Sequence, residues 1–159
     1  MPSCCASSSC ASDAAYVKLP DANLLVYAIN GRAEYHEPAR CWLEAALSGT
    51  ETVAFSWIVL LAFVRLTTRR AVFVEPLAPA TALDLVDGWL AQPCATIVHQ
   101  TARHAAILRD LLTQAGTAGN LTSDAHLAAL AIEHGAELCS YDGDFARFPG
   151  LRWSRPAAA

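Results

Sequence analysis

Lysine is almost missing from this sequence, since Lys18 is the only lysine among 11 basic residues. A phosphate-binding P-loop is therefore excluded, because it needs a lysine after a glycine-rich turn and no GxxxxGK[ST] run is present. The formal net charge of −4 disfavours a protein that coats nucleic acid through overall positive charge. A local basic patch stays open.

Long hydrophobic runs are also missing, and no apolar stretch approaches the roughly 20 residues of a membrane span. Residues 1–15, MPSCCASSSCASDAA, have neither the basic region nor the apolar region of a signal peptide. We interpret residues 1–15 as a disordered extension and residues 16–159 as the folded domain. A cytoplasmic protein without a membrane association is the expectation.

The six cysteines form no pattern of spaced pairs, which a zinc knuckle or a disulfide framework would require. Three lie within the first ten residues, and the others lie singly at Cys41, Cys94 and Cys139. We expect these last three to be buried thiols that pack as small hydrophobic side chains, as suits a reducing compartment.

A chain of 159 residues with 54% hydrophobic and 16% charged residues is typical of one globular domain. Short apolar runs alternate with longer amphipathic segments. Strands are predicted at 16–19, 52–55, 95–98, 137–140 and 151–153. Helices are predicted at 23–29, 37–47, 57–68, 79–90, 101–114 and 122–133. Strands separated by helices predict an α/β fold, with a mainly parallel sheet flanked by helices.

Four aspartates lie beside predicted strand ends or helix starts, where ligands bind in open parallel sheets. Asp21 follows the first strand, Asp142 and Asp144 follow the strand that ends at Ser140, and Asp124 lies in the first turn of a helix. Carboxylates that converge repel one another unless a cation neutralises them, and carboxylate oxygens suit Mg²⁺ or Mn²⁺ better than zinc. The pattern therefore predicts a divalent-metal site.

Each aspartate also has an ordinary structural explanation. Asp124 would complement the helix dipole, worth ~0.3–1 kcal/mol. Asp142 with the following glycine forms a typical turn dipeptide, and Asp21 could cap a helix. A serine hydrolase is disfavoured because no GxSxG is present, and the five histidines form no HExxH. His126, nearly opposite Asp124 on its helix, is expected to be a core or surface residue.

Three segments together resemble a known family: LPDANLL at 19–25, TSDAHLAALA at 122–131 and SYDGDF at 140–145. In this order and spacing, from about residue 16 to 153, they resemble the PIN-domain ribonucleases, specifically the VapC toxins. The resemblance implies a single PIN-like domain, an α/β/α sandwich.

By the same resemblance, the protein is the toxin of a type II toxin–antitoxin pair and a divalent-metal-dependent endoribonuclease that hydrolyses RNA phosphodiester bonds. Asp21 and Asp124 would hold Mg²⁺ or Mn²⁺, and Asp142 or Asp144 would complete or orient the site. The implied partners are an RNA substrate, a VapB-type antitoxin and a second copy of the chain in a homodimer.

Several other residues are candidates for supporting roles. Asn23, Ser56 and Thr122 would support the metal ligands or contact phosphate, although helix capping explains Asn23 and Thr122 equally well. The basic cluster of Arg65, Arg69 and Arg70 would contact RNA, with a solvated helix face as the alternative.

One position departs from the family. The helix after the second strand usually carries a glutamate in a Glu-Phe-x-Arg pattern, and this chain has Ala62 in that place, followed by Phe63 and Arg65. The site therefore loses one carboxylate. The alternative function is a catalytically weakened PIN-fold module that binds RNA or a partner protein without cleavage.

Overall fold

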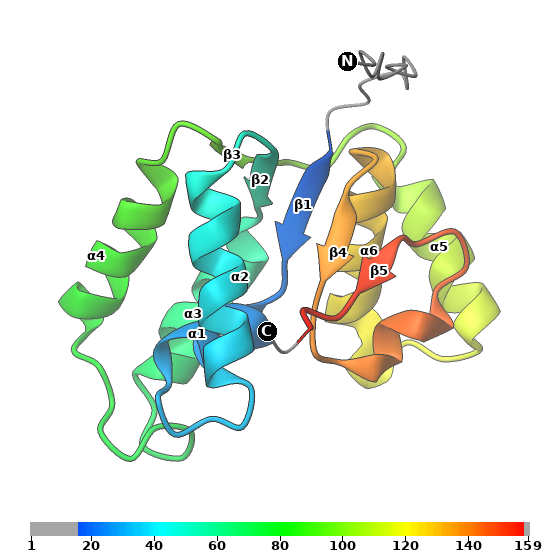
Figure 1. Cartoon of the computed structure of the whole chain (residues 1–159). Helices are drawn as coiled ribbons and strands as arrows, with labels where there is room; N and C mark the ends of the chain where they lie inside the picture. The colour runs from blue at the N-terminus through cyan, green and yellow to red at the C-terminus, as the bar shows by residue number, and fades with distance from the viewer. Residues whose placement is uncertain (1–15, 158–159) are drawn as a thin grey trace, which may run out of the picture.

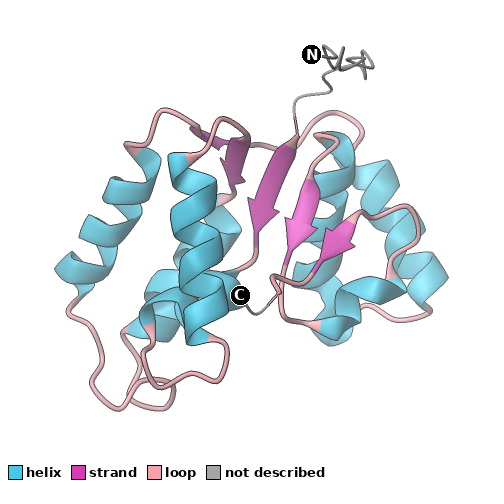
Figure 2. Cartoon of the chain, viewed as in Figure 1, coloured by secondary structure: helices cyan, strands magenta, loops and turns pink. Residues whose placement is uncertain are grey.

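One parallel sheet of five strands forms the centre of the molecule, as Figures 1 and 2 show. The computed structural model describes residues 16–157. The strand order is β3-β2-β1-β4-β5, and every neighbouring pair is parallel. The strands are β1 (Val17–Pro20), β2 (Thr52–Phe55), β3 (Ala95–Ile97), β4 (Glu137–Cys139) and β5 (Trp153–Ser154).

Helices connect the successive strands, and Figure 1 shows α2 in front of the sheet and α6 behind it. The α-helices are α1 (Ala22–Ile29), α2 (His36–Ser48), α3 (Trp57–Thr67), α4 (Pro79–Leu90), α5 (His104–Ala115) and α6 (Thr122–Glu133). Two 3₁₀ turns, η1 (Gly119–Leu121) and η2 (Gly143–Arg147), precede α6 and follow β4. The predicted α/β fold with a parallel sheet flanked by helices is confirmed.

Two predicted boundaries are wrong by more than one residue, whereas the other bounds agree with the structure or differ from it by a single residue. The helix predicted from residue 101 begins at His104, because the backbone and side chain of Thr101 are bound to Glu133 instead of starting the helix. The last strand was predicted at 151–153 and lies at Trp153–Ser154, where it pairs with β4.

The core lies between the sheet and the helices, and α6 packs through alanines. Ala125, Ala128, Ala129 and Ala131 have no exposed surface. Their short side chains let the backbone of α6 approach the sheet closely, as the dense packing of protein interiors requires. The N-terminal turn of α6 is thereby held at a fixed position beside the sheet.

Strand register brings the candidate residues to one edge of the sheet. Pro20 at the end of β1 is paired with Cys139 at the end of β4, so the residues that follow them, Asp21 and Ser140, become neighbours. Because α6 leads directly into β4 through the left-handed turn at Gly135, it runs back along the sheet. The first turn of α6 therefore lies at the carboxyl edge.

Within residues 16–157 no helix combines the length and the apolar character that a membrane crossing needs.

The prediction that three cysteines are buried is confirmed only in part, since Cys139 is buried, Cys94 is half-buried and Cys41 is exposed. Cys41 lies on the solvent side of α2, whose buried face consists of Ala39, Leu43 and Ala46. The predicted extension at 1–15 lies outside the described residues.

Candidate active site

Asp21 links the end of β1 to the start of α1. Its Oδ1 accepts a hydrogen bond from the backbone N–H of Ala22 at 2.6 Å, so the residue caps α1 as its structural explanation predicted. Its Oδ2 accepts from Ser140 Oγ at 2.9 Å. Burial raises the pKa of Asp21, and these hydrogen bonds lower it by less. The carboxyl therefore has a structural contact on each oxygen and is poorly solvated.

The hydroxyl of Ser140, which is fully buried, connects three site residues. It donates to Asp21 and accepts from the backbone N–H of Asp142 at 3.0 Å and from Asn23 Nδ2 at 3.1 Å. Asn23 Oδ1 accepts in turn from the N–H of Tyr141 at 3.3 Å. Sequence reasoning treated Ser140 only as the end of a strand. The available signal was a small polar residue between a buried strand and a pair of aspartates.

Three carboxylates, those of Asp21, Asp124 and Asp142, line one cavity of about 260 Å³. The other lining residues come mainly from α1, α3 and α6: Ala22, Asn23, Ile58, Val59, Ala62, Arg65, Leu66, Ser123 and Leu127. The structure thus brings together residues that lie more than 100 positions apart in the chain.

The pKa of Asp124 shows the electrostatic environment of the cavity most clearly. Burial raises the pKa of Asp124 to about 6, helped by the negative charges of Asp21, Asp142 and Asp144. A helix dipole at the first turn of α6 would favour the charged carboxylate. Since the pKa is raised instead, desolvation and like-charge repulsion outweigh the dipole at this position.

Asp142 and Asp144 differ in position although they are two residues apart. Asp142 lines the cavity, and its Oδ1 also accepts from the N–H of Asp144 at 2.9 Å, which begins the turn η2. Asp144 is exposed, lies outside the lining of the cavity and faces Arg147 at 3.8 Å. Of the two, Asp142 is the one that the fold places beside Asp21 and Asp124.

Ser56 and Thr122 do not line the cavity. Ser56 is buried at the start of α3 and makes no capping hydrogen bond through its side chain. Thr122 is exposed, and its Oγ1 donates to the carbonyl of Gly119 at 2.9 Å instead of accepting from a helix N–H. Helix capping is therefore the wrong explanation for Thr122, and also for Asn23, because Asp21 caps α1.

The basic cluster is divided by the structure. Arg65 lines the cavity, whereas Arg69 and Arg70 are exposed beyond the end of α3 and do not line it. Ala62, at the position where the family usually has a glutamate, also faces the cavity. The position where the family usually has the acid therefore lies in the wall of this cavity.

The donor set suits a hard divalent cation, because carboxylate oxygens are the ligands that Mg²⁺ and Mn²⁺ prefer. No three His, Cys, Asp or Glu side chains in the described part of the chain are close enough together to ligate one ion. Mg²⁺ usually binds through one or two carboxylates and keeps several waters. A closed cage of protein ligands is therefore not required.

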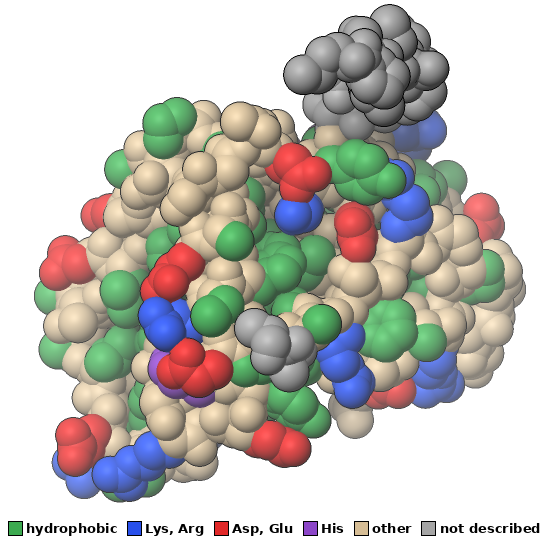
Figure 3. Space-filling model, in the orientation of Figure 1, with side chains coloured by type: hydrophobic (Ala, Val, Ile, Leu, Met, Phe, Trp, Pro, Cys, Tyr) green, Lys and Arg blue, Asp and Glu red, His purple; other side chains and the backbone are tan. Residues whose placement is uncertain are grey.

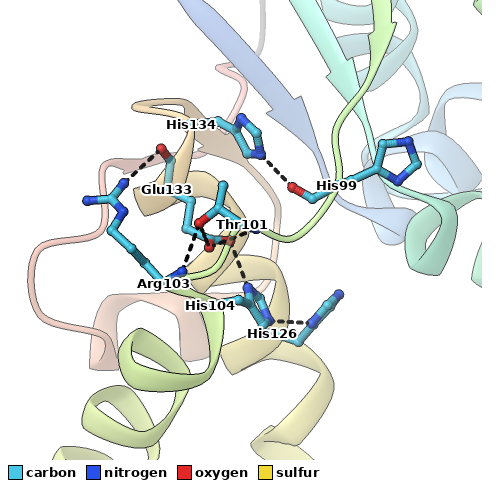
Figure 4. A network of polar contacts seen from close by, with 7 residues as sticks. All are labelled: His99, Thr101, Arg103, His104, His126, Glu133 and His134. Carbon is cyan, nitrogen blue, oxygen red and sulfur yellow. Dashed lines mark hydrogen bonds and ion pairs between the residues drawn. The ribbon is translucent and has the colours of Figure 1, made fainter.

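A second polar network joins α5 to α6 (Figure 4). The Glu133 side chain, fully shielded from solvent, accepts from the N–H of Thr101 at 3.1 Å and from Thr101 Oγ1 at 2.5 Å, and contacts His104 Nδ1 at 2.7 Å. His104 Nε2 lies 2.9 Å from His126 Nδ1. His126 is half-buried and does not line the cavity, so its place agrees with the expectation of a core or surface residue outside the site.

Charged side chains of both signs are interspersed over the face shown in Figure 3, without a large patch of either sign. Arg40, for example, pairs with Glu37 and Glu44 on α2 at 2.9 Å each. Extended positive charge is therefore not the feature that distinguishes this face.

Comparisons of this chain with a family model and with known proteins point to the same family. The PIN domain model matches residues 18–151. Ribonuclease VapC37 of Mycobacterium tuberculosis is 52% identical over 142 residues, which cover 89% of this chain and 99% of that protein. Ribonuclease VapC33 of the same organism is 38% identical over 138 residues, covering 87% and 96%.

Solved structures share the fold at lower identity. The DNA-bound VapBC complex of Salmonella typhimurium contains a chain with a TM-score of 0.63 and 22% identity, covering 89% of this chain and 99% of that one. Mycobacterium tuberculosis VapC20, described as a toxin that cleaves the sarcin–ricin loop, has a TM-score of 0.59 and 20% identity, covering 85% and 98%.

Proposed function

The chain belongs to the PIN domain family, and from that premise we propose that it is a ribonuclease, the toxin of a type II toxin–antitoxin pair. The relatives with 52% and 38% identity are both named VapC ribonucleases, and they match nearly along their full length. The reaction is hydrolysis of an RNA phosphodiester. Water forms a new bond to phosphorus, one ester P–O bond breaks, and the departing oxygen takes up a proton.

The observation that carries the proposal is the shared cavity of Asp21, Asp124 and Asp142 at the carboxyl edge of the sheet. Carboxylates gathered in this way repel one another, as the raised pKa of Asp124 reflects. A bound cation would convert that repulsion into affinity. The cluster is better explained as a cation site than as three independent structural aspartates.

Within this proposal, Asp21 and Asp124 hold Mg²⁺ or Mn²⁺, and Asp142 orients the site. When bound, the metal lowers the pKa of a coordinated water and stabilises negative charge on the phosphate. Ser140 and Asn23 fix the orientation of Asp21 and of the chain at Asp142 through their hydrogen bonds. Asp144, Ser56 and Thr122 have at most an indirect part, because they do not line the cavity.

The partners follow from the same premise. An RNA is the substrate, a VapB-type antitoxin is the inhibitor, and a second copy of the chain forms a homodimer; the VapBC complex from Salmonella typhimurium is an assembly of that kind of pair. A cytoplasmic location is part of the proposal, because cysteines without a pattern of spaced pairs suit a reducing compartment.

The test uses the purified chain and a pool of transfer and ribosomal RNA with Mg²⁺ or Mn²⁺. We expect cleavage by the wild type, none by Asp21→Asn, and full cleavage by the control Asp87→Asn, whose exposed carboxylate lies on α4. Calorimetry should detect divalent-metal binding by the wild type and by the control, but not by Asp21→Asn. Absence of both cleavage and metal binding in the wild type would refute the proposed ribonuclease activity.

Ala62 favours one alternative, a PIN-fold module that binds RNA or a protein without cleaving, because its methyl group occupies the wall of the cavity where the family usually has a carboxylate. The variant Ala62→Glu separates the two functions. A large gain in cleavage would mean that the native site is weakened, and little change would mean that three aspartates suffice.

A further inference from the structure

Arg65 is the one basic side chain among the residues that line the carboxylate cavity. It comes from α3, whereas the aspartates come from the ends of β1 and β4 and from the first turn of α6. The cavity thus has carboxylates from three segments and a guanidinium from a fourth. Its wall between them is apolar, formed by Ile58, Val59, Ala62, Leu66 and Leu127.

Among residues 16–157, no carboxylate lies within 4.0 Å of the Arg65 guanidinium. Some other arginines of the described part are engaged, since Arg40 pairs with Glu37 and Glu44, and Arg155 donates to the carbonyl of Tyr141 at 2.9 Å. Several exposed arginines of the same part are unpaired like Arg65, so it is the position of Arg65 in the cavity wall that distinguishes it. The helix of Arg65 has no acidic residue, and Ala62, one turn earlier on the cavity side, carries only a methyl group. Arg65 therefore has no carboxylate partner within its own helix, and its charge there interacts only with the helix dipole, from the last turn of α3.

The cavity leaves room between the two kinds of charge. A volume of about 260 Å³ is several times the roughly 30 Å³ that one water occupies in the liquid. A group that bridges the carboxylates and the arginine must present cationic charge, or a bound cation, on one side and anionic oxygens on the other. A phosphodiester accompanied by a divalent cation meets both requirements.

We propose that Arg65 binds the non-bridging oxygens of the phosphodiester held in this cavity, opposite the carboxylates, and so has a different role from Arg69 and Arg70. This inference rests on the proposed ribonuclease function. The planar guanidinium can donate two parallel hydrogen bonds to a phosphate, which a lysine cannot reproduce. During hydrolysis those oxygens gain negative charge, so the contact strengthens as the reaction proceeds.

Arg69 and Arg70 lie beyond the end of α3, outside the cavity lining. Contacts from such positions reach phosphates of the flanking chain. They add salt-dependent affinity, about one unit of slope for each phosphate contact, and do not act on the reacting group. The two classes of arginine are therefore separable by kinetics.

The first experiment compares the kinetics of four variants on a cleavable RNA. We expect Arg65→Gln to lower kcat by about 100-fold and Arg65→Lys to recover part of that loss, because the charge stays but the two-point contact is lost. Arg69→Gln should raise KM and reduce the salt slope by about one, with kcat unchanged. Arg109→Gln, an exposed arginine on α5, is the control and should behave as the wild type.

Because Arg65 is exposed, Arg65→Lys should keep the wild-type melting temperature, and Arg65→Gln should lower it only slightly, through the lost interaction with the dipole of α3. A change in KM and salt slope alone, as for Arg69→Gln, would overturn the proposal. It would return Arg65 to the group of flanking contacts.

The second experiment measures binding when cleavage is blocked, using a labelled RNA oligonucleotide and the Asp124→Asn background. Adding Arg65→Gln should weaken binding by about tenfold, and adding Arg109→Gln should not change it. An unchanged Kd with Arg65→Gln overturns the assignment. If the wild type cleaves no RNA at all, the proposed function fails, while this binding measurement still decides whether Arg65 contacts RNA.

Discussion

The carboxyl of Asp124 has its pKa raised from 3.8 to about 6, first by burial and then by the charges of Asp21, Asp142 and Asp144. The folded, metal-free protein thus holds this proton more tightly than the unfolded chain does. Between about pH 4 and pH 6 the folded state binds more protons, so its stability falls as the pH rises through this window. Ionised Asp124 is a destabilising feature of the metal-free protein.

Replacement of Asp124 by asparagine removes that penalty. At pH 7 we expect the metal-free variant to be at least as stable as the wild type. The gain should not exceed about 1 kcal/mol, because solvent screens the repulsion between the half-exposed Asp124 and its neighbours. The stabilisation that Mg²⁺ or Mn²⁺ gives by mass action should be lost. Thermal melts with chelator and with metal measure both effects, with Asp87→Asn, an exposed aspartate on α4, as the control. A variant that is less stable in chelator and keeps the full metal increment would leave Asp124 with a helix-dipole role alone.

The hydroxyl of Ser140 holds the carboxylate site in place through its hydrogen bonds. Without its hydroxyl, Asp21 loses a donor, and both the N–H of Asp142 and Asn23 Nδ2 lose an acceptor in a buried place. Ser140→Ala should therefore reduce the free energy of unfolding by about 1–3 kcal/mol and impair cleavage. Ser48→Ala, an exposed serine bonded only within its own helix, is the control. Equal stability of the two variants in urea titrations would contradict this.

At the scale of elements, the contact between α5 and α6 depends on the carboxylate of Glu133. Burial raises the pKa of Glu133, but hydrogen bonds from Thr101 and His104 outweigh it, and the net pKa is lowered from 4.5. A carboxyl with a lowered pKa in the folded state stabilises the protein above its ordinary pKa. That contribution is lost as the pH falls below about 4.5.

We expect Glu133→Gln to destabilise the protein by about 1–3 kcal/mol at pH 7, since charged acceptors make the stronger hydrogen bonds. The variant should also lose less stability than the wild type between pH 5 and pH 3, because an ordinary glutamate carboxyl takes up its proton within this range. Chemical denaturation across this range measures both effects. Glu44→Gln, on the exposed face of α2, controls for the loss of one charge. Parallel pH profiles for Glu133→Gln and the wild type would argue that the network is incidental.

At the scale of the whole molecule, the described residues account for the sheet and its helices without residues 1–15. β1 pairs with both β2 and β4 in the centre of the sheet, and it begins at Val17. Deletion of residues 1–15 should therefore leave the melting temperature and the cleavage rate unchanged, because that segment has no periodic apolar face to bury. Deletion as far as Pro20 removes β1 and should prevent folding. A melting temperature several degrees lower after the shorter deletion would contradict the prediction.

Local patterns in the sequence determined most elements of this protein. The helices at Pro79–Leu90 and Thr122–Glu133 and the strand at Thr52–Phe55 have the predicted bounds, because apolar periodicity, proline and glycine act over a few residues. The alternation of strands and helices likewise predicted a parallel sheet. The start of α5 was missed because it depends on Glu133, a partner about 30 residues away.

Only the tertiary structure decided which candidates meet. Strand register places Asp21 beside Ser140, and the return path of α6 brings Asp124 to the same cavity. The sequence offered Asp142 and Asp144 as equals, and Arg65 with Arg69 and Arg70 as one cluster. The fold turns Asp142 and Arg65 toward the cavity and leaves the others outside it. Residue type and spacing identify the chemistry that is available, but the packing of distant segments selects the side chains that can act on one group, because only spatial proximity lets their charges combine.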